Sequence, residues 1–150
     1  MTVTAPKRQA VGVRRAGYVV SMLVNAAVLY AVNVWPGWAA LPFLTPDAEQ
    51  VIGLVNASIV VSLVANLVYL VRDPRWLRAL GDLVTLSVGL AAMWRIWQVF
   101  PFDFSGSSFD WTLVARILLG LGIVGSAIGI VTAIVGFVRG VASASSPSRA

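Results

Sequence analysis

Four long apolar stretches, separated by short polar segments, dominate the chain. They cover residues 16–35, 51–71, 79–100 and 111–138. Each reaches the roughly 20 residues that an α-helix needs to cross about 30 Å of hydrocarbon. The pattern therefore predicts an all-α integral membrane protein, built as an antiparallel bundle of four transmembrane helices joined by short loops.

Prolines and capping residues mark the ends of these stretches. Trp35-Pro36-Gly37 ends the first stretch, and Phe100-Pro101 ends the third. Thr45-Pro46 and Asp73-Pro74 each place a capping residue before a proline, which suits the first position of a helix. Ser107, with Asp110 three residues later, predicts a capping box for the fourth helix.

The charged residues predict the orientation of the helices. Cytoplasmic loops retain lysine and arginine, and with four spans nine basic residues share one side. These are Lys7, Arg8, Arg14, Arg15, Arg72, Arg75, Arg78, Arg139 and Arg149. The opposite loops contain acids and no basic residue. Both termini are therefore expected in the cytoplasm of a multi-pass protein of the cell (plasma) membrane.

Composition narrows the possible functions. The chain has 59% hydrophobic and 11% charged residues and a mean hydropathy of +0.87. With neither cysteine nor histidine, it lacks the usual metal ligands and general bases, so we expect no metal, no cofactor and no enzyme activity. The net charge of +5 points to anionic lipid on the cytoplasmic side rather than to nucleic acid, because so apolar a chain does not fold in water. Arginine-rich usage favours a bacterial source.

Three segments are expected along the chain. Residues 1–15 form a basic cytoplasmic segment, residues 16–140 form the four-helix transmembrane domain, and residues 141–150 form a small, polar, disordered cytoplasmic tail.

Polar residues inside the apolar stretches are the first candidates for a site. Asn25, Ser62, Asn66, Asp82 and Arg95 would line a hydrophilic path if they face one another across the bundle. The alternative is that such stripes only join helices by hydrogen bonds, typically worth about 0.6 kcal/mol each.

Arg95 and Arg116 are a second candidate. Both lie about five residues from the outer ends of their helices, so together they would form an anion or lipid-headgroup site. The alternative is a rim in which these arginines pair with Asp103 and Asp110.

The fourth helix is expected to have a packing face of small residues. Gly122, Gly125, Gly129 and Gly136 recur at spacings near three and four, which permits close approach of another helix. The sequence leaves open whether that helix belongs to the same chain or to another copy.

Two functions remain in view. The first is a non-catalytic assembly or accessory component that binds itself or a membrane protein partner through the glycine face or the aromatic outer loops, such as Phe100 to Phe104. The second is a small oligomeric transporter or channel with a polar path through the membrane.

Overall fold

The computed structural model describes residues 11–145, and every regular element in that range is helical. The four long helices are α1 (Val11–Asn33), α2 (Glu49–Val71), α3 (Arg75–Val99) and α4 (Trp111–Ser145). Two short 3-10 helices, η1 (Trp38–Ala40) and η2 (Pro46–Ala48), lie between α1 and α2. The prediction of an all-helical chain is confirmed for these residues.

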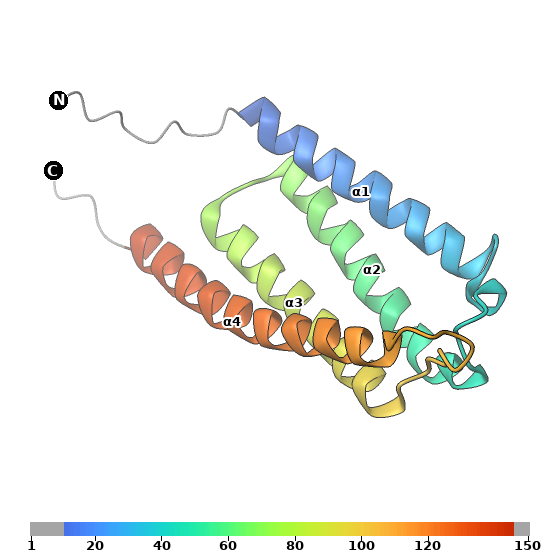
Figure 1. Ribbon diagram of the computed structural model, residues 1–150. Coiled ribbons are helices and arrows are strands. Elements are labelled where there is room, and N and C mark those ends of the chain that lie inside the picture. The colour runs from blue at the N-terminus through green and yellow to red at the C-terminus, as the bar shows by residue number, and fades with distance from the viewer. Residues whose placement is uncertain (1–10, 146–150) are drawn as a thin grey trace, which may run out of the picture.

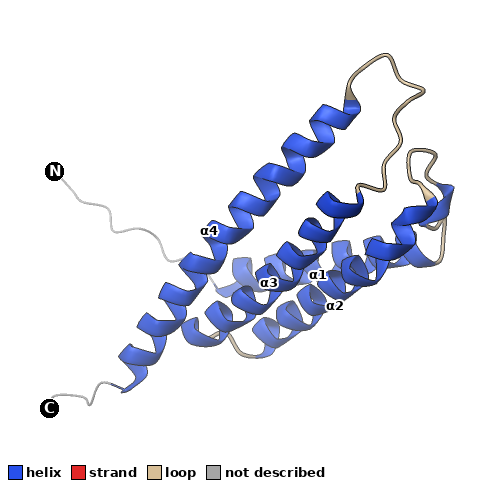
Figure 2. Cartoon of the chain, turned by 90° about the horizontal axis from the view of Figure 1, so that it is seen from below, coloured by secondary structure: helices blue, strands red, loops and turns tan. Residues whose placement is uncertain are grey.

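The helices stand in an open row in chain order. Extensive packing joins α1 to α2, α2 to α3, and α3 to α4, so α1 and α4 form the two edges of the row (Figure 1). Seen from below, α4 diverges from the other three (Figure 2). Val11 and Ser145 lie at the same end of the molecule, which we call the basic end, and the connections α1–α2 and α3–α4 lie at the other, the loop end (Figure 1). The contacts between the long helices therefore join neighbours along the chain.

All four helices are long and apolar enough to cross a membrane. Few of their side chains are buried, and α1 has no buried residue at all. The exposed surface consists mainly of valine, leucine and isoleucine, for example Leu23 and Leu121, which are 66% and 65% exposed. Such a surface suits lipid, because lipid hydrocarbon chains are as apolar as these side chains and pack against them equally well. The chain is therefore built as a multi-pass membrane protein.

The helices extend beyond the predicted stretches at both ends of the chain. α1 begins at Val11, so the last residues of the predicted basic segment 1–15 are already helical. α4 continues to Ser145, so the predicted disordered tail is helical over its first half. Hydropathy marks the part of a helix that suits lipid, whereas a helix extends as long as its backbone hydrogen bonds continue. Lys7, Arg8 and Arg149 lie outside the described residues.

Two of the predicted caps differ from expectation. Asp110 accepts the backbone N–H of Leu113 at 2.9 Å and is itself the cap of α4, while Ser107 accepts the N–H of Phe109 in a local turn. The predicted capping box is therefore wrong, because the capping residue of α4 is Asp110, three residues later than Ser107. Before α3, Pro74 occupies the capping position, which leaves the Asp73 carboxylate free to bind side chains of other helices.

The two connections at the loop end pair with each other. Thr45 donates its backbone N–H to the carbonyl of Pro101 at 3.0 Å, and Asp103 donates to the carbonyl of Phe43 at 2.8 Å. Pro101 is fully buried beneath this antiparallel bridge. The rings of Phe43 and Phe104 stack with centroids 5.9 Å apart. The aromatic segment from Phe100 to Phe104 thus packs against its own chain.

The glycines of α4 pack against α3. A Cβ atom added at Gly122 would lie 2.7 Å from the sulfur of Met93, and one at Gly129 would lie 3.0 Å from a methyl of Leu86. At Gly136 the nearest atom would be the Cβ of Ala79 at 3.6 Å. Gly125 has nothing within 4 Å, so its place in the predicted face is a correction. Ser126, which lies between Gly122 and Gly129 at spacings of four and three, is buried.

We predict that Gly129→Leu lowers the melting temperature in detergent, because the larger side chain meets Leu86 and overpacking of this kind costs about 1–3 kcal/mol. Gly125→Leu, on the same helix but facing open space, is the matched control and should leave the melting temperature nearly unchanged. Equal losses in both variants would contradict the α3–α4 packing.

Candidate functional site

Polar side chains join α1 to α2 along almost their whole length. On α1 four of them recur at spacings of four, three and four, and three residues of α2 together with one in the connection that follows it repeat the same spacing. This spacing holds a seam between two helices in contact. The two sets are Arg14, Tyr18, Ser21, Asn25 and Ser62, Asn66, Tyr69, Asp73.

The pairs across this seam run in opposite directions along the two helices. The Nε of Arg14 lies 3.1 Å from an oxygen of Asp73, and the rings of Tyr18 and Tyr69 have centroids 5.5 Å apart. Asn25 donates to the hydroxyl of Ser62 at 3.3 Å. The partner's number falls as the α1 number rises.

One further pair extends the seam toward the loop end. Asn33 and Asn56 exchange amide hydrogen bonds of 2.9 and 2.7 Å. Asn56 is not among the candidate residues that the sequence indicated. The sequence spacing alone gives little indication of its role. Asn56 lies ten residues before Asn66, so it is offset around the axis of α2 from the stripe of Ser62 and Asn66.

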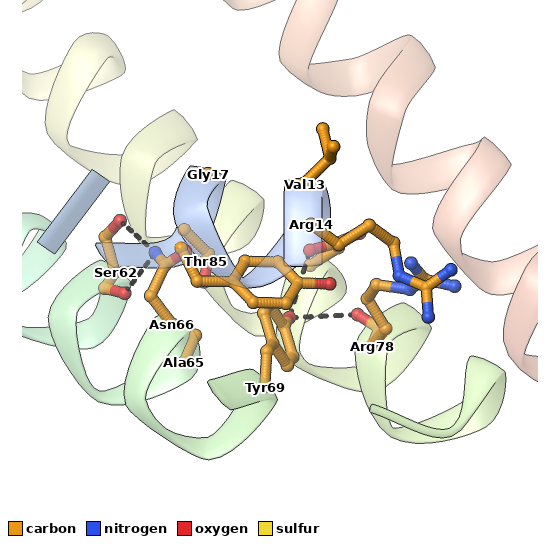
Figure 3. A pocket seen from close by; sticks show the side chains of 11 residues that line it. Val13, Arg14, Gly17, Ser62, Ala65, Asn66, Tyr69, Arg78 and Thr85 are labelled. Carbon is orange, nitrogen blue, oxygen red and sulfur yellow. Dashed lines mark hydrogen bonds between the residues drawn. The ribbon is translucent and has the colours of Figure 1, made fainter. Parts of the chain in front are cut away.

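A cavity of about 630 Å³ opens between α1, α2 and α3 near the basic end (Figure 3). Its polar lining includes Arg14 from α1, Ser62 and Asn66 from α2, and Arg78 and Asp82 from α3. The structure therefore brings together Ser62, Asn66 and Asp82 of the predicted path, and Asn25 joins them through its hydrogen bond to Ser62. Arg95 lies away from this cavity.

An aspartate at the basic end of the cavity holds two arginines. Asp73 contacts the Nε of Arg14 at 3.1 Å and the Nε of Arg78 at 3.4 Å. Its side chain is only 18% exposed, so the pairs are partly shielded from solvent. The two ion pairs connect α1 and α3 across the end of α2. The carboxylate fixes both guanidinium groups at the entrance of the cavity.

Tyr69 connects α2 to α3 beside Asp82. Its hydroxyl lies 3.0 Å from an oxygen of Asp82 and 3.0 Å from the carbonyl of Arg78, and its side chain is buried. A Cβ atom at Gly81 would collide with this hydroxyl. The Gly81-Asp82 pair thus has a geometric role, because the glycine leaves room for the tyrosine ring and the Asp82 carboxylate accepts a hydrogen bond from the tyrosine hydroxyl. Asp82 is otherwise exposed to the cavity.

A second cavity, of about 610 Å³, lies on the other side of α3, against α4. Arg78, Asp82 and Thr85 line both cavities. The Thr85 hydroxyl is buried and has no hydrogen-bond partner. One polar stripe of α3 is therefore reachable from two sides of the row.

The predicted site of Arg95 and Arg116 is divided between different partners. Arg95 donates to the side-chain carbonyl of Gln50 on α2 at 3.2 Å. The guanidinium of Arg116 lies over the rings of Phe100 and Trp97, at 4.3 and 5.3 Å from their centroids. Neither arginine forms an ion pair with Asp103 or Asp110 within the described residues. Both the joint anion site and the salt-bridged rim are thus replaced by contacts within the helix row.

Comparison of the chain with known protein families, with curated proteins and with solved structures finds no match. The chemistry of the site therefore rests on its own residues. Within the described part of the chain, no three acidic, histidine or cysteine side chains gather as a metal site would require. The groups that do gather are guanidinium, carboxylate, amide and hydroxyl, which bind charged or polar molecules by hydrogen bonds.

We predict that Asp73→Asn destabilises the protein by about 1–3 kcal/mol, because it leaves the shielded guanidinium groups of Arg14 and Arg78 without their shared counter-charge. Thermal unfolding in detergent measures the loss. The same substitution should cost less in an Arg14→Gln background, since one of the two pairs is already absent. An equal loss of stability from Asp73→Asn in the wild-type and Arg14→Gln backgrounds would show that the Arg14–Asp73 pair contributes nothing.

Proposed function

We propose that this chain is a four-span protein of the plasma membrane with antiparallel helices and both termini in the cytoplasm. The distribution of charge supports the proposal. Six of the described arginines belong to the basic end: Arg14, Arg15, Arg72, Arg75, Arg78 and Arg139. The loops at the opposite end contain acidic residues and neither lysine nor arginine. A basic end in the cytoplasm is the orientation that membrane insertion favours.

The orientation predicts which residues an impermeant reagent can reach. The chain has no cysteine, so a single introduced cysteine reports one position. Cysteine in Ser107→Cys should react with an impermeant maleimide in intact cells, and cysteine in Ser145→Cys should react only after the membrane is opened. Reaction of Ser145→Cys in intact cells would reverse the orientation.

We further propose that the protein binds a small charged or polar solute in the cavity between α1, α2 and α3, as part of a transport path. The cavity lining is the supporting observation, because it gathers two arginines, an aspartate and hydrogen-bonding groups within apolar helices. Ionisable residues at such a position are costly in lipid and typically serve a transported or bound species. We propose a non-catalytic role for the same residues, because the sequence has neither histidine nor cysteine to act as a general base or a thiolate nucleophile.

A second copy of the chain would complete the path. The row of four helices is open, so one wall of the polar stripe on α3 is missing in a single chain. A homo-oligomer supplies that wall without a new kind of subunit. The alternative is an assembly or accessory component for another membrane protein. The surfaces first considered for that role are largely engaged within the chain, because the glycines pack on α3 and the aromatic loops pack on each other.

Anionic lipid is the expected companion of the basic end. Arg75 and Arg139 lie there in addition to the arginines held by Asp73. Each arginine near an anionic surface contributes roughly 1 kcal/mol, and salt weakens the attraction.

The solute-binding proposal requires that water enters the cavity. In inside-out membrane vesicles, cysteine in Ser62→Cys or Asn66→Cys should react with a charged methanethiosulfonate reagent, because both positions line the cavity. Val64→Cys is the matched control, since it lies between them on α2 but faces outward with 54% exposure. A thiol surrounded by lipid stays protonated and reacts poorly. Equal reactivity at all three positions would contradict a water-filled cavity.

A further inference from the structure

A separate groove of about 710 Å³ lies at the loop end and shares no lining residue with the polar cavity. The two paired outer loops form its upper part, and the first turns of α4 form its lower part. The part formed by the loops is lined by Phe43, Asp103 and Phe104. The part formed by α4 is lined by Trp111, Val114 and Leu118. The groove is thus polar at one margin and apolar along the rest.

The apolar part has the dimensions of a lipid chain segment. Trp111 and Leu118 are seven residues apart on α4, which corresponds to about 10 Å along the helix. Aromatic side chains at the upper margin are typical of the level where headgroups meet hydrocarbon. An amphiphile seated here would place its head beside the loops and a chain along α4.

The polar margin selects the charge of that head. Asp103 is exposed, and hydrogen bonds from the Ser105 hydroxyl and backbone N–H hold the pKa of its carboxyl below the usual range. It is therefore ionised at neutral pH. Segments 34–48 and 100–110 contain no lysine or arginine that could compete for it. The nearby Arg116 is engaged over Phe100 and Trp97 and does not line the groove.

We propose that this groove binds one phospholipid whose headgroup is a primary ammonium, as in phosphatidylethanolamine. The ammonium donates N–H hydrogen bonds to the Asp103 carboxylate, and one acyl chain lies against Val114 and Leu118. A choline headgroup has the same positive charge but no N–H to donate, so the carboxylate distinguishes the two.

The test is native mass spectrometry of the purified protein after incubation with an equimolar mixture of phosphatidylethanolamine and phosphatidylcholine with identical acyl chains. These lipids carry the same net charge, so the arginines at the basic end should not separate them. The proposal expects retained phosphatidylethanolamine to exceed phosphatidylcholine by about fivefold, as a single exposed charged hydrogen bond would give. Equal retention of the two lipids would overturn it.

Two aspartate variants locate the preference. Asp103→Asn should abolish it, whereas Asp47→Asn, which removes the same charge from the other outer loop outside the groove, should keep it. Val114→Trp should lower retention of both lipids by filling the apolar part, with the melting temperature confirming that the protein is folded. If Asp103→Asn keeps the preference, or Asp47→Asn loses it equally, the groove is not the site.

Discussion

The absence of water between lipid chains is the constraint on which this structure depends. In lipid, an exposed leucine loses nothing by staying exposed, so the hydrophobic effect does not hold the helices together. What remains is hydrogen bonding, charge pairing and close contact between small residues. Hydrogen bonds and charge pairs join α1 to α2 and to the connection after it, from Arg14–Asp73 to Asn33–Asn56. Close contact of small residues joins α3 to α4. Tyr69, held by Asp82 and admitted by Gly81, joins these two halves.

This division explains why some features were predictable from the sequence and others were not. Four spans follow from length and hydropathy, and the stripes Ser21–Asn25 and Ser62–Asn66 follow from helical spacing. The sequence does not reveal which stripe meets which helix, because lipid accepts every apolar face equally. Arg95 illustrates the limit: its depth suggested a path, but its partner is Gln50 on the neighbouring helix. Gly125 fits the small-residue spacing as well as Gly129, and only the crossing of α3 distinguishes them.

The charged residues within the apolar stretches, Asp82, Arg95 and Arg116, each have a partner in the structure. Asp73 holds Arg14 and Arg78, Asp82 accepts from Tyr69, and Arg116 lies on aromatic rings. A charge near hydrocarbon is costly unless such partners lower its energy. Because Asp82 and Arg78 also border both cavities, an entering solute would exchange hydrogen bonds with groups already in place, rather than meet unpaired charges.

The bridge between the outer loops also bears on how the protein is made. Thr45 and Pro101 are joined by a backbone hydrogen bond, yet the two complete long helices α2 and α3 separate them along the chain. During synthesis the α1–α2 hairpin can pair its polar side chains as soon as both helices have entered the membrane. Its loop must then wait, with the Thr45 N–H and the Phe43 carbonyl bound to water, until α3 has crossed and delivered residues 101–103. The second hairpin therefore completes the first, and a ribosome that stalls before residue 101 would leave a half-built protein whose outer loop has no lasting partner.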